Sequence, residues 1–527
     1  MNKDQLSEYR DQIDQIDRQI IKLLEERFEV VHGVGEYKKA QGLPVLDAAR
    51  EKQKLEALTK LCEESKRTYM EEILKGIMAQ SRRFQEDHGV GQAQASGEGK
   101  AQAPGEGLSQ AQVAPACRFG LLGRKLSHSH SPVIHKMLGG YEYGIFEREP
   151  EQLEAFFEDD SWEGINVTIP YKREVMRYCD ELSETAIACN SVNTIVREHE
   201  EHGLITRGHN TDYDGFCYMV KCSGIDPRGK KALVLGSGGV SGTVSQVMKD
   251  LGADPVIIIS RTGENNYGNL DHHKDAAIIV NTTPVGMYPH AGEAALDIGL
   301  FPACEAVYDL IYNPLRTKLM LDAQRLGIPA YGGLLMLVAQ AAKAGQLFGQ
   351  TLTKTTEDVY QELRKGLENI VLIGMPGAGK TTTGKILAEN TGRRFLDLDH
   401  VITQHQGRTP EEIILEDGVD RFREIESQVL ETLVRGIQTG GLVLACGGGI
   451  VEREHNRELL QENGQVVWLR RELSELPTEG RPVSQADGLE RILQRRKPAY
   501  ESWSDLAVDA IGVQETAARI EQRLRKE

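Results

Sequence analysis

Residues 370–381 read "IVLIGMPGAGKT", and this stretch decides the fold of the C-terminal part of the chain. The apolar run at 370–373 predicts a buried strand, and the sequence after the glycines has the character of a helix. Between them, residues 374–381 match GxxxxGK[ST], a loop whose backbone N–H groups surround the phosphates of a nucleotide. Lys380 would reach the β- and γ-phosphates, and the Thr381 hydroxyl would bind Mg²⁺. The stretch therefore predicts an α/β domain that binds a nucleoside triphosphate.

The composition limits which partners the protein can have. Its 527 residues carry a formal net charge of -17, so nucleic acid and anionic membrane surfaces would repel it. The first residues, "MNKDQLSEYR", lack the pattern of a secretion signal, and no apolar run approaches the roughly 18 residues of a membrane span. Eight cysteines without regular spacing indicate reduced thiols. We therefore expect a cytoplasmic protein that binds small molecules, with no nucleic acid and no membrane as partner.

The chain divides at residues 89–116, a segment rich in Gly, Ala, Gln and Ser that predicts a flexible linker. Before it, residues 1–88 hold apolar side chains at helical spacing and predict an all-helical domain. After it, strand-like apolar runs alternate with helical stretches, which is the pattern of α/β domains. The expected parts are a substrate-binding domain with its C-terminal return, a nucleotide-binding domain, a connecting helix and the P-loop domain: residues 117–222 with 325–350, 223–324, 351–367 and 368–527.

Polar motifs close to the P-loop narrow its substrate. "LDLDH" (396–400) places Asp397 and Asp399 at a predicted strand end, "RFREIE" (421–426) supplies Arg423, and "CGGG" (446–449) ends another predicted strand. Guanidinium groups are suited to bidentate capture of a carboxylate. With these motifs, residues 368–527 resemble shikimate kinase.

That resemblance implies phosphoryl transfer from ATP, with Mg²⁺, to the 3-hydroxyl of shikimate. It implies that Asp399 accepts the hydroxyl proton, that Thr381 and Asp397 hold the metal, and that Arg481 stabilises the transferring phosphoryl group. ATP would bind Gly377, Ala378, Gly379, Lys380, Thr381 and Thr382. The carboxylate of shikimate would bind Arg423, Gly447, Gly448, Gly449 and Arg496.

A second glycine-rich turn lies in "KALVLGSGGVSG" (231–242), again between a predicted strand and a predicted helix. This arrangement is typical of a dinucleotide-binding βαβ unit. The next predicted strand, "PVIIIS", ends at Arg261, where an NAD-binding unit would have an acidic residue. A cation at this place favours the 2′-phosphate of NADP. The expected cofactor contacts are Gly236, Ser237, Gly238, Gly239, Val240, Arg261 and Thr262.

The stretch "INVTIPYK" (165–172) predicts a half-buried strand that Pro170 ends, with Asn166 and Thr168 on one face and a lysine close behind. It is accompanied by "HSHSP" (128–132), "SVNT" (191–194), "HNTDYDG" (209–215), "NTTPVGMYP" (281–289), "DLIYNP" (309–314) and "GGLLMLVAQAA" (332–342). Together these motifs resemble shikimate dehydrogenase over residues 117–350.

The dehydrogenase resemblance implies hydride transfer between the nicotinamide of NADP and C3 of the substrate, which interconverts 3-dehydroshikimate and shikimate. Lys172 and Asp212 would form the catalytic pair, because the C3 oxygen must gain or lose a proton in step. Shikimate would lie among Ser129, Ser131, Asn166, Thr168, Asn193, Tyr312 and Gln340. Only nineteen residues separate Arg261 from Asn281, so we expect a shortened nucleotide-binding domain.

Charged and polar residues recur along the N-terminal helical segment: Arg10, Arg27, Lys38, Asp47, Arg50, Glu51, Ser81 and Gln85. In this order they resemble the helical chorismate mutases over residues 4–88. The resemblance implies rearrangement of chorismate to prephenate, a reaction that needs donors placed where charge develops and no base. Arg10, Arg27, Lys38 and Gln85 would be catalytic, and the other four would bind the substrate.

Helix geometry separates two of these arginines. On one helix, Arg10 and Arg27 would lie about 100° apart, whereas Arg27 and Lys38 fall within about 20° of each other. In the mutase family the first-helix arginine of a partner chain completes the pocket. We therefore expect a homodimer through the N-terminal helices, with Arg10 acting in trans.

The sequence as a whole predicts a multidomain chain: an all-α N-terminal domain, a two-domain α/β dehydrogenase with a Rossmann-like unit, and an α/β P-loop kinase. It predicts a trifunctional enzyme of the shikimate pathway with NADP, ATP and Mg²⁺ as cofactors. Two alternatives remain open at this point. The helical segment could be a regulatory module that binds an effector and dimerises, and the dehydrogenase could use quinate in place of shikimate.

Overall fold

The computed structural model describes residues 23, 27, 30, 31, 74, 77, 78, 81, 117–126, 129–201, 203–288, 290–435, 440–476 and 488–524. The chain forms two compact units, residues 1–111 and 112–527. In the first unit all the described residues are helical, which agrees with the spacing of its apolar side chains. Among the described helices, none has both the length and the apolar character needed to cross a membrane.

The second unit begins with a mixed six-stranded sheet in the order β2-β1-β3-β5-β6-β4. Its strands are β1 (Phe119–Gly123), β2 (Gly144–Glu147), β3 (Gly164–Val167), β4 (Glu181–Leu182), β5 (Thr194–Glu200) and β6 (Gly203–His209). Three helices belong to this domain, α4 (Ser131–Gly139), α5 (Leu153–Glu158) and α6 (Glu184–Cys189).

Strand β3 differs from its sequence-based prediction. All four of its residues are buried, and it ends at Val167, before Thr168 and Pro170. The prediction of a half-buried strand was wrong because both faces of β3 are covered. Ile165 and Val167 pack in one apolar cluster, and Gly164 on the other face lies against the ring of Phe348. Ile169, which was expected in the strand, is 78% exposed.

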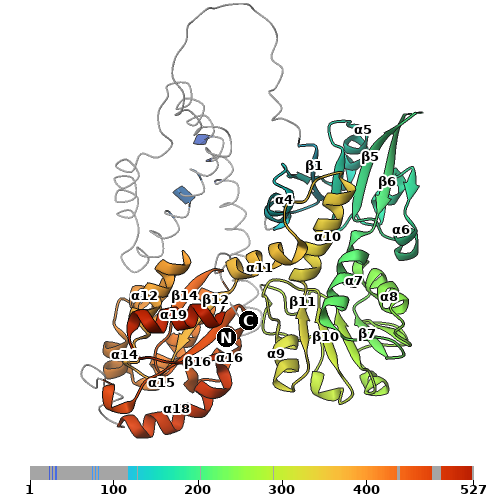
Figure 1. Ribbon diagram of the computed structural model, residues 1–527. Helices are drawn as coiled ribbons and strands as arrows, with labels where there is room; N and C mark the ends of the chain where they lie inside the picture. The colour runs from blue at the N-terminus through green and yellow to red at the C-terminus, as the bar shows by residue number, and fades with distance from the viewer. Residues whose placement is uncertain are drawn as a thin grey trace, which may run out of the picture. The chain divides into compact units, whose positions relative to one another are not determined.

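Two helices, α7 (Thr211–Ser223) and α10 (Leu334–Leu347), pack side by side between this sheet and the next one (Figure 1). The next sheet is parallel throughout, in the order β11-β10-β9-β7-β8. Its elements are β7 (Ala232–Leu235), α8 (Gly239–Asp250), β8 (Val256–Ile259), β9 (Ile278–Asn281), β10 (Ala306–Asp309), α9 (Lys318–Arg325) and β11 (Ala330–Gly332). Ligands bind such a sheet at the carboxyl ends of the strands where the order reverses, here beside β7.

The nucleotide-binding sheet has a short connection between β8 and β9, and it ends later in the chain than the sequence predicted. Between β8 and β9 the chain forms a single 3-10 turn, Leu270–His273, in agreement with the predicted shortening. The return to the first domain does not start at residue 325, because β11 still pairs in parallel with β10. It starts at α10. The sequence hid this boundary because β11 has only three residues and no apolar run.

Helix α11 (Thr356–Leu367) starts at a capping box in which Thr355 and Asp358 exchange hydrogen bonds. Its buried Val359 and Leu363 pack in one cluster with Ile134 and Leu138 of α4. The connecting helix is thus part of the core that α4 and α10 form. A single residue, Glu368, separates it from the first strand of the kinase region.

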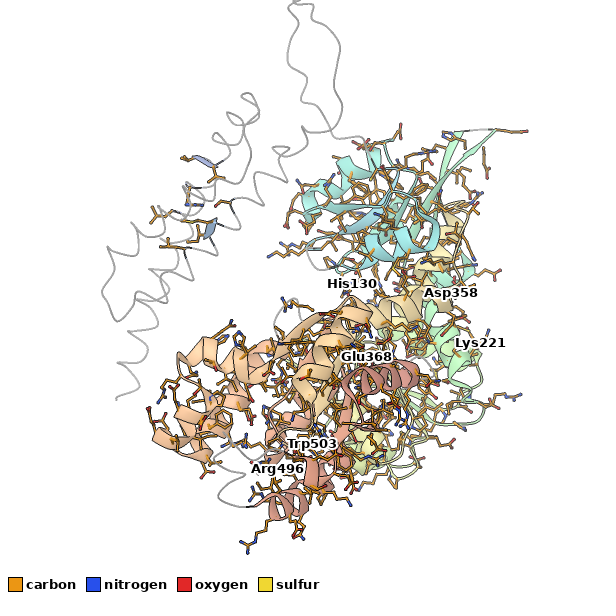
Figure 2. The ribbon with its side chains drawn as sticks, turned by 60° about the vertical axis from the view of Figure 1, so that its left-hand side comes forward. His130, Lys221, Asp358, Glu368, Arg496 and Trp503 are labelled. Carbon is orange, nitrogen blue, oxygen red and sulfur yellow. The ribbon has the colours of Figure 1, made fainter. Side chains whose placement is uncertain are left out.

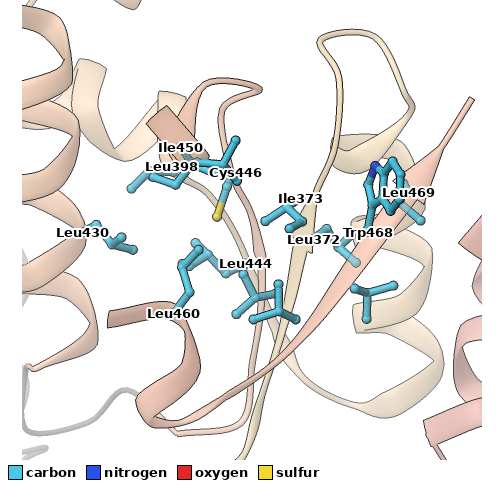
Figure 3. Close-up of a cluster of buried hydrophobic side chains, with 14 of the residues drawn as sticks. Leu372, Ile373, Leu398, Leu430, Leu444, Cys446, Ile450, Leu460, Trp468 and Leu469 are labelled. Atoms are coloured by element: carbon cyan, nitrogen blue, oxygen red, sulfur yellow. The ribbon is translucent and has the colours of Figure 1, made fainter. Parts of the chain in front are cut away.

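The last domain has a parallel sheet in the order β13-β14-β12-β15-β16. Its strands are β12 (Asn369–Ile373), β13 (Arg394–Asp397), β14 (Leu442–Ala445), β15 (Gly464–Arg470) and β16 (Leu506–Asp509). Its helices are α12 (Lys380–Thr391), α13 (Leu398–Gln406), α14 (Pro410–Asp417), α15 (Val419–Val434), α16 (His455–Glu462), α18 (Leu489–Trp503) and α19 (Val513–Leu524). Figure 3 shows side chains of the central strands, such as Leu372, Leu444 and Trp468, filling the core between the layers.

Gly333 provides a test of packing at the start of α10. Its φ is -68°, so alanine would not strain the backbone, but an added Cβ would lie 2.1 Å from the carbonyl oxygen of Leu310. We expect Gly333→Ala to lower the free energy of unfolding by about 1–3 kcal/mol. The matched control is Gly366→Ala in α11, where the added Cβ meets nothing within 4 Å and should stabilise by about 0.5–1 kcal/mol. Thermal unfolding followed by calorimetry measures both, and equal shifts would contradict the steric argument.

Candidate active sites

Lys172 follows β3, and its ammonium lies 2.5 Å from the carboxylate of Asp212. Asp212 belongs to the first turn of α7, which Asn210 caps by accepting a hydrogen bond from the backbone N–H of Tyr213. A carboxylate is stabilised at such a helix N-terminus. The two side chains are 17% and 11% exposed, so a small molecule can still reach them. The structure thus brings the two predicted catalytic residues into contact from positions forty residues apart.

A buried hydrogen-bond network joins several predicted substrate residues. Asn193 Oδ1 accepts a hydrogen bond from the backbone N–H of Thr211 at 2.6 Å. Thr211 Oγ1 in turn donates to Gln340 Oε1 at 3.4 Å. Asn166 Nδ2 donates to Thr194 Oγ1 at 2.9 Å, and Thr194 lies 2.9 Å from Thr211 through the two hydroxyls. The network fixes three predicted amides, Asn166, Asn193 and Gln340, relative to one another.

Sequence reasoning missed three members of this network. Thr194 and Thr211 lie inside motifs that were recognised, but their hydroxyls were given no role. Tyr143 donates to Asn166 Oδ1 at 2.7 Å, stacks on the ring of His135, and had no signal in the sequence. Burial lowers the pKa of His135 to about 3, so this ring is neutral. Tyr143 therefore orients the Asn166 amide through its hydrogen bond to Oδ1.

The other predicted substrate residues come from neighbouring segments. The hydroxyls of Ser129 and Ser131, at the start of α4, lie 3.2 Å apart. The ring of Tyr312, after β10, packs edge-on to His130 at 5.8 Å between centroids. Burial raises the pKa of the Tyr312 phenol, which keeps it a neutral hydrogen-bond donor. Thr168 is held through its backbone N–H, which donates to Leu122.

The glycine-rich turn after β7 leaves space above it. An added Cβ at Gly238 or Gly239 would meet nothing within 4 Å, and α8 begins at Gly239. Gly236 differs, because it has φ 103° and a Cβ there would lie 3.0 Å from Thr282 Oγ1. The turn thus leaves open space at a helix N-terminus, which is where phosphates bind. Arg261 and Thr262 are exposed directly after β8, on the same edge of the sheet.

The P-loop lysine is buried. Lys380 Nζ donates to the carbonyls of Gly374 and Met375 at 2.9 and 3.0 Å. Burial lowers the pKa of Lys380 to about 8, against the opposing effect of Asp399. Beside it, Thr381 Oγ1 donates to Asp397 Oδ2 at 2.6 Å, so these two predicted metal ligands are in direct contact.

Asp399 is placed by its neighbours at the start of α13, where its backbone N–H donates to Asp397 Oδ1. Burial, and next the charge of Asp397, raise the pKa of the Asp399 carboxyl. A carboxyl group with a raised pKa is suited to take a proton from a hydroxyl. The "CGGG" backbone passes directly over it, since a Cβ at Gly447 would lie 3.0 Å from Asp399 Oδ1.

The two predicted carboxylate-binding arginines share an acidic partner. Arg423 Nε donates to Glu452 Oε2 at 2.9 Å, and Arg496 Nε donates to Glu452 Oε1 at 3.0 Å. Arg423 also pairs with the buried Glu426 at 2.7 Å. Arg496 and Trp503 lie on the same helix, α18 (Figure 2). A Cβ at Gly449 would lie 1.7 Å from Arg423 Nη2, so the guanidinium touches the backbone of the glycine run.

Some predicted residues lie outside the described part of the chain. They are Arg10, Lys38, Asp47, Arg50, Glu51 and Gln85 in the first unit and Arg481 in the kinase region. Two predicted mutase residues are described. Arg27 donates through Nη1 to the hydroxyl of Ser81, which is buried and donates to the Ile77 carbonyl at 2.6 Å. The structure brings these two residues together from positions 54 residues apart.

Fold and sites together define a nucleotide-dependent oxidoreductase joined to a P-loop phosphotransferase. Over its middle part the chain is 34% identical to the shikimate dehydrogenase (NADP(+)) of Clostridium perfringens (strain SM101), across 47% of this chain and 98% of the relative. It is 36% identical to the enzyme of the same name from Methanopyrus kandleri, across 44% and 89%. A solved chorismate mutase/shikimate 5-dehydrogenase fusion protein from Clostridium acetobutylicum matches 47% of this chain and 97% of its own, with 33% identity and a TM-score of 0.43.

Three family models match successive parts of the chain. Residues 9–86 match chorismate mutase type II, residues 121–195 match the shikimate dehydrogenase substrate binding domain, and residues 376–525 match shikimate kinase. The chain belongs to the shikimate dehydrogenase family, and it joins this enzyme to a chorismate mutase and a shikimate kinase. The match at residues 9–86 disfavours the alternative of a purely regulatory helical segment.

Asp309, at the end of β10, predicts a pH dependence of stability. Burial raises the pKa of its carboxyl to about 6, although Thr317, Ile311 and Asn281 all donate hydrogen bonds to it. Because this pKa lies above the value of about 3.9 for an unfolded chain, its contribution to stability falls as pH rises from about 4 to about 6, by about 3 kcal/mol. An Asp309→Asn side chain does not titrate and can donate to Thr317.

We therefore expect the Asp309→Asn variant to gain stability relative to wild type between pH 4.5 and pH 7.5. Calorimetric unfolding of both proteins at the two pH values measures the difference. A stability difference that stays constant across this range would contradict the proposed burial of a titrating carboxyl.

Proposed function

We propose that the three regions catalyse chorismate to prephenate rearrangement, NADP-dependent interconversion of 3-dehydroshikimate and shikimate, and ATP-dependent phosphorylation of shikimate at its 3-hydroxyl. The observation that carries the dehydrogenase assignment is the contact of Lys172 with Asp212 at 2.5 Å beside a network of aligned amides. The product of the second reaction is the substrate of the third, so one chain supplies consecutive steps.

In the dehydrogenase reaction, Lys172 donates a proton to the C3 oxygen when the ketone is reduced and takes it back in the reverse direction. Asp212 holds the ammonium in position for the substrate through their contact at 2.5 Å. NADP supplies or accepts the hydride when it is bound. The turn at Gly238 and Gly239 has room for its phosphates, and Arg261 is an exposed cation suited to its 2′-phosphate. The same relatives carry NADP(+) in their names.

In the kinase reaction, Asp399 accepts the proton of the 3-hydroxyl, and its raised pKa supports this role. ATP supplies the phosphoryl group and fits the P-loop around Lys380. Mg²⁺ fits the paired oxygens of Thr381 and Asp397, since this cation prefers hard oxygen ligands. Arg423 and Arg496 bind the carboxylate of shikimate, and Arg481 acts on the transferring phosphoryl group.

The mutase assignment requires a second chain in our proposal. Arg27 and Ser81 are joined by a hydrogen bond, and Leu23 and Val30 are 63% and 68% exposed. Their spacing of seven residues would put the two apolar side chains on one face of a helix. Exposed apolar side chains on one face favour contact with another helix. We propose a homodimer through these helices, with Arg10 completing the partner's pocket, in a cytoplasmic enzyme.

Reciprocal variants test the two proton-transfer residues. Lys172→Ala should lower shikimate oxidation about 10²- to 10⁴-fold while phosphorylation of shikimate continues, because proton transfer contributes that factor. Asp399→Asn should do the reverse, and each variant is the matched control for the other. Steady-state assays with NADP and NAD, and with shikimate and quinate, measure the rates and the preferences. Near wild-type oxidation by the Lys172 variant would end the catalytic assignment.

Complementation tests the shared mutase site. Arg10→Ala chains and Arg27→Ala chains, unfolded and refolded together, form mixed dimers in which one site carries both changes and the other carries neither. Chorismate mutase activity should then rise above that of either variant alone. If mixed dimers form and activity stays at the level of the variants, Arg10 acts within its own chain. Light scattering measures the mass of the oligomer, which should equal that of two chains.

A further inference from the structure

Within the unit 112–527, two loops of the dehydrogenase region contact the kinase region. The first loop, residues 282–288, follows β9, and the second, residues 310–317, follows β10. Both meet the chain segment that leads from α16 into β15. We call the contact group of Tyr288, Arg316, Arg435, Glu462 and Asn463 the Tyr288 cluster.

The hydroxyl of Tyr288 is at the centre of this cluster. It accepts a hydrogen bond from Asn463 Nδ2 at 3.1 Å, and its proton can go to Val434 O at 3.1 Å or to Glu462 Oε2 at 3.2 Å. Burial raises the pKa of Tyr288, so the phenol keeps its proton and remains a donor. Glu462 is 1% exposed and pairs with Arg435 at 3.0 Å. Every polar group around this hydroxyl therefore belongs to the kinase region.

The second loop is held by backbone contacts. The N–H of Leu315 donates to Asn463 Oδ1 at 2.8 Å, and the N–H of Arg316 donates to the Glu462 carbonyl at 2.9 Å. The Arg316 guanidinium donates to the Gly464 carbonyl and lies 3.5 Å from Asp505. The two loops also touch each other, because the N–H of Tyr288 donates to the carbonyl of Asn313. One cluster thus holds both loops.

The dehydrogenase sheet faces this cluster with the carboxyl ends of its strands, and the kinase sheet faces it with the amino ends of its strands. In the dehydrogenase the loops leave the carboxyl ends of β9 and β10, the edge that also carries the glycine-rich turn. At the start of the first loop, Thr282 Oγ1 donates to the carbonyl of Leu235, one residue before Gly236. In the kinase, Asn463 and Asp505 precede β15 and β16, whereas the P-loop follows the carboxyl end of β12. The loop 282–288 therefore links the cluster to the cofactor turn, because its first residue is bonded beside that turn and its last residue belongs to the cluster. In the kinase, the cluster lies at the sheet edge opposite the P-loop.

We propose that the kinase region supports the cofactor site of the dehydrogenase, with Tyr288 as a positioning residue that anchors the loop 282–288. The inference rests on the proposed NADP-dependent dehydrogenase function. The kinase region holds the far end of a loop whose near end, Thr282, is bonded beside the turn that receives the cofactor. The kinase site lies at the other edge of its own sheet, so we expect changes in the cluster to leave the kinase reaction unaffected.

The test compares two tyrosine-to-phenylalanine variants of the full chain. Tyr288→Phe removes the hydroxyl and leaves Asn463 Nδ2 without that acceptor. We expect KM for NADP to rise roughly three- to tenfold, the factor that one net hydrogen bond supplies, with kcat for shikimate oxidation within about twofold of wild type. Kinase kinetics should not change. The matched control is Tyr331→Phe. The Tyr331 hydroxyl donates at 3.1 Å to the backbone carbonyl of Ser223, so the bond that this variant loses lies inside the dehydrogenase.

A second variant alters the Tyr288 cluster at a residue of the kinase region. Glu462→Gln keeps the volume and one acceptor but removes the charge opposite Arg435. It should raise KM for NADP in the same direction, although residue 462 is far along the chain from the dehydrogenase motifs. Shikimate phosphorylation by this variant should match wild type.

Failure of the positioning role and failure of the proposed dehydrogenase function would give different results. Equal KM values for the Tyr288 and Tyr331 variants would overturn the positioning role. A fall in kcat at constant KM, the mark of a smaller folded fraction, would also overturn it, as would a kinase defect in Glu462→Gln. Absence of NADP-dependent turnover in wild type would instead reject the proposed dehydrogenase function.

Discussion

Both described sites depend on backbone that approaches other groups more closely than a Cβ atom permits. A Cβ at Gly449 would lie 1.7 Å from the Arg423 guanidinium, and a Cβ at Gly448 would lie 2.6 Å from the ring of Pro376 in the P-loop. In the dehydrogenase, a Cβ at Gly236 would lie within 3.0 Å of both Thr282 and Thr283. At each place a strand has just ended, and the glycines let two loops from different strands share one small space.

The charges at these sites are compensated within the protein. Lys172 is paired with Asp212, Lys380 is held by two carbonyls near Asp399, and Arg423 and Arg496 converge on Glu452. Partial burial makes such compensation necessary, because an isolated buried charge is costly. Each pair leaves some of its hydrogen-bonding capacity free for a ligand. Arginine is suited to this role, since it has five N–H donors and can hold one carboxylate while it binds another.

The sequence was sufficient for the features that depend on local order. The P-loop and the turn after β7 were predicted from short motifs, because each consists of neighbouring residues whose spacing has a chemical reason. Lys172 and Asp212, forty residues apart, were predicted through the resemblance to shikimate dehydrogenase. Tyr143 could not be found this way, since its contact with Asn166 spans 23 residues and depends on the fold that brings the segment before β2 close to β3. The burial of β3 on both faces was missed for the same reason. Strand β11 was missed because three residues carry no pattern that distinguishes a strand from a loop.

The junction between dehydrogenase and kinase constrains how the two can meet. Helix α11 is anchored in the dehydrogenase core through Val359 and Leu363, and only Glu368 stands between its end and β12. The amino end of β12 must therefore stay within a few ångströms of the dehydrogenase, and its carboxyl end, five residues on, lies about 17 Å further away. Because all strands of that sheet are parallel, the same edge of β14, β15 and β16 is brought to the junction. A short connection thus exposes the non-catalytic edge of the kinase to the dehydrogenase loops and keeps the P-loop edge free for nucleotide exchange.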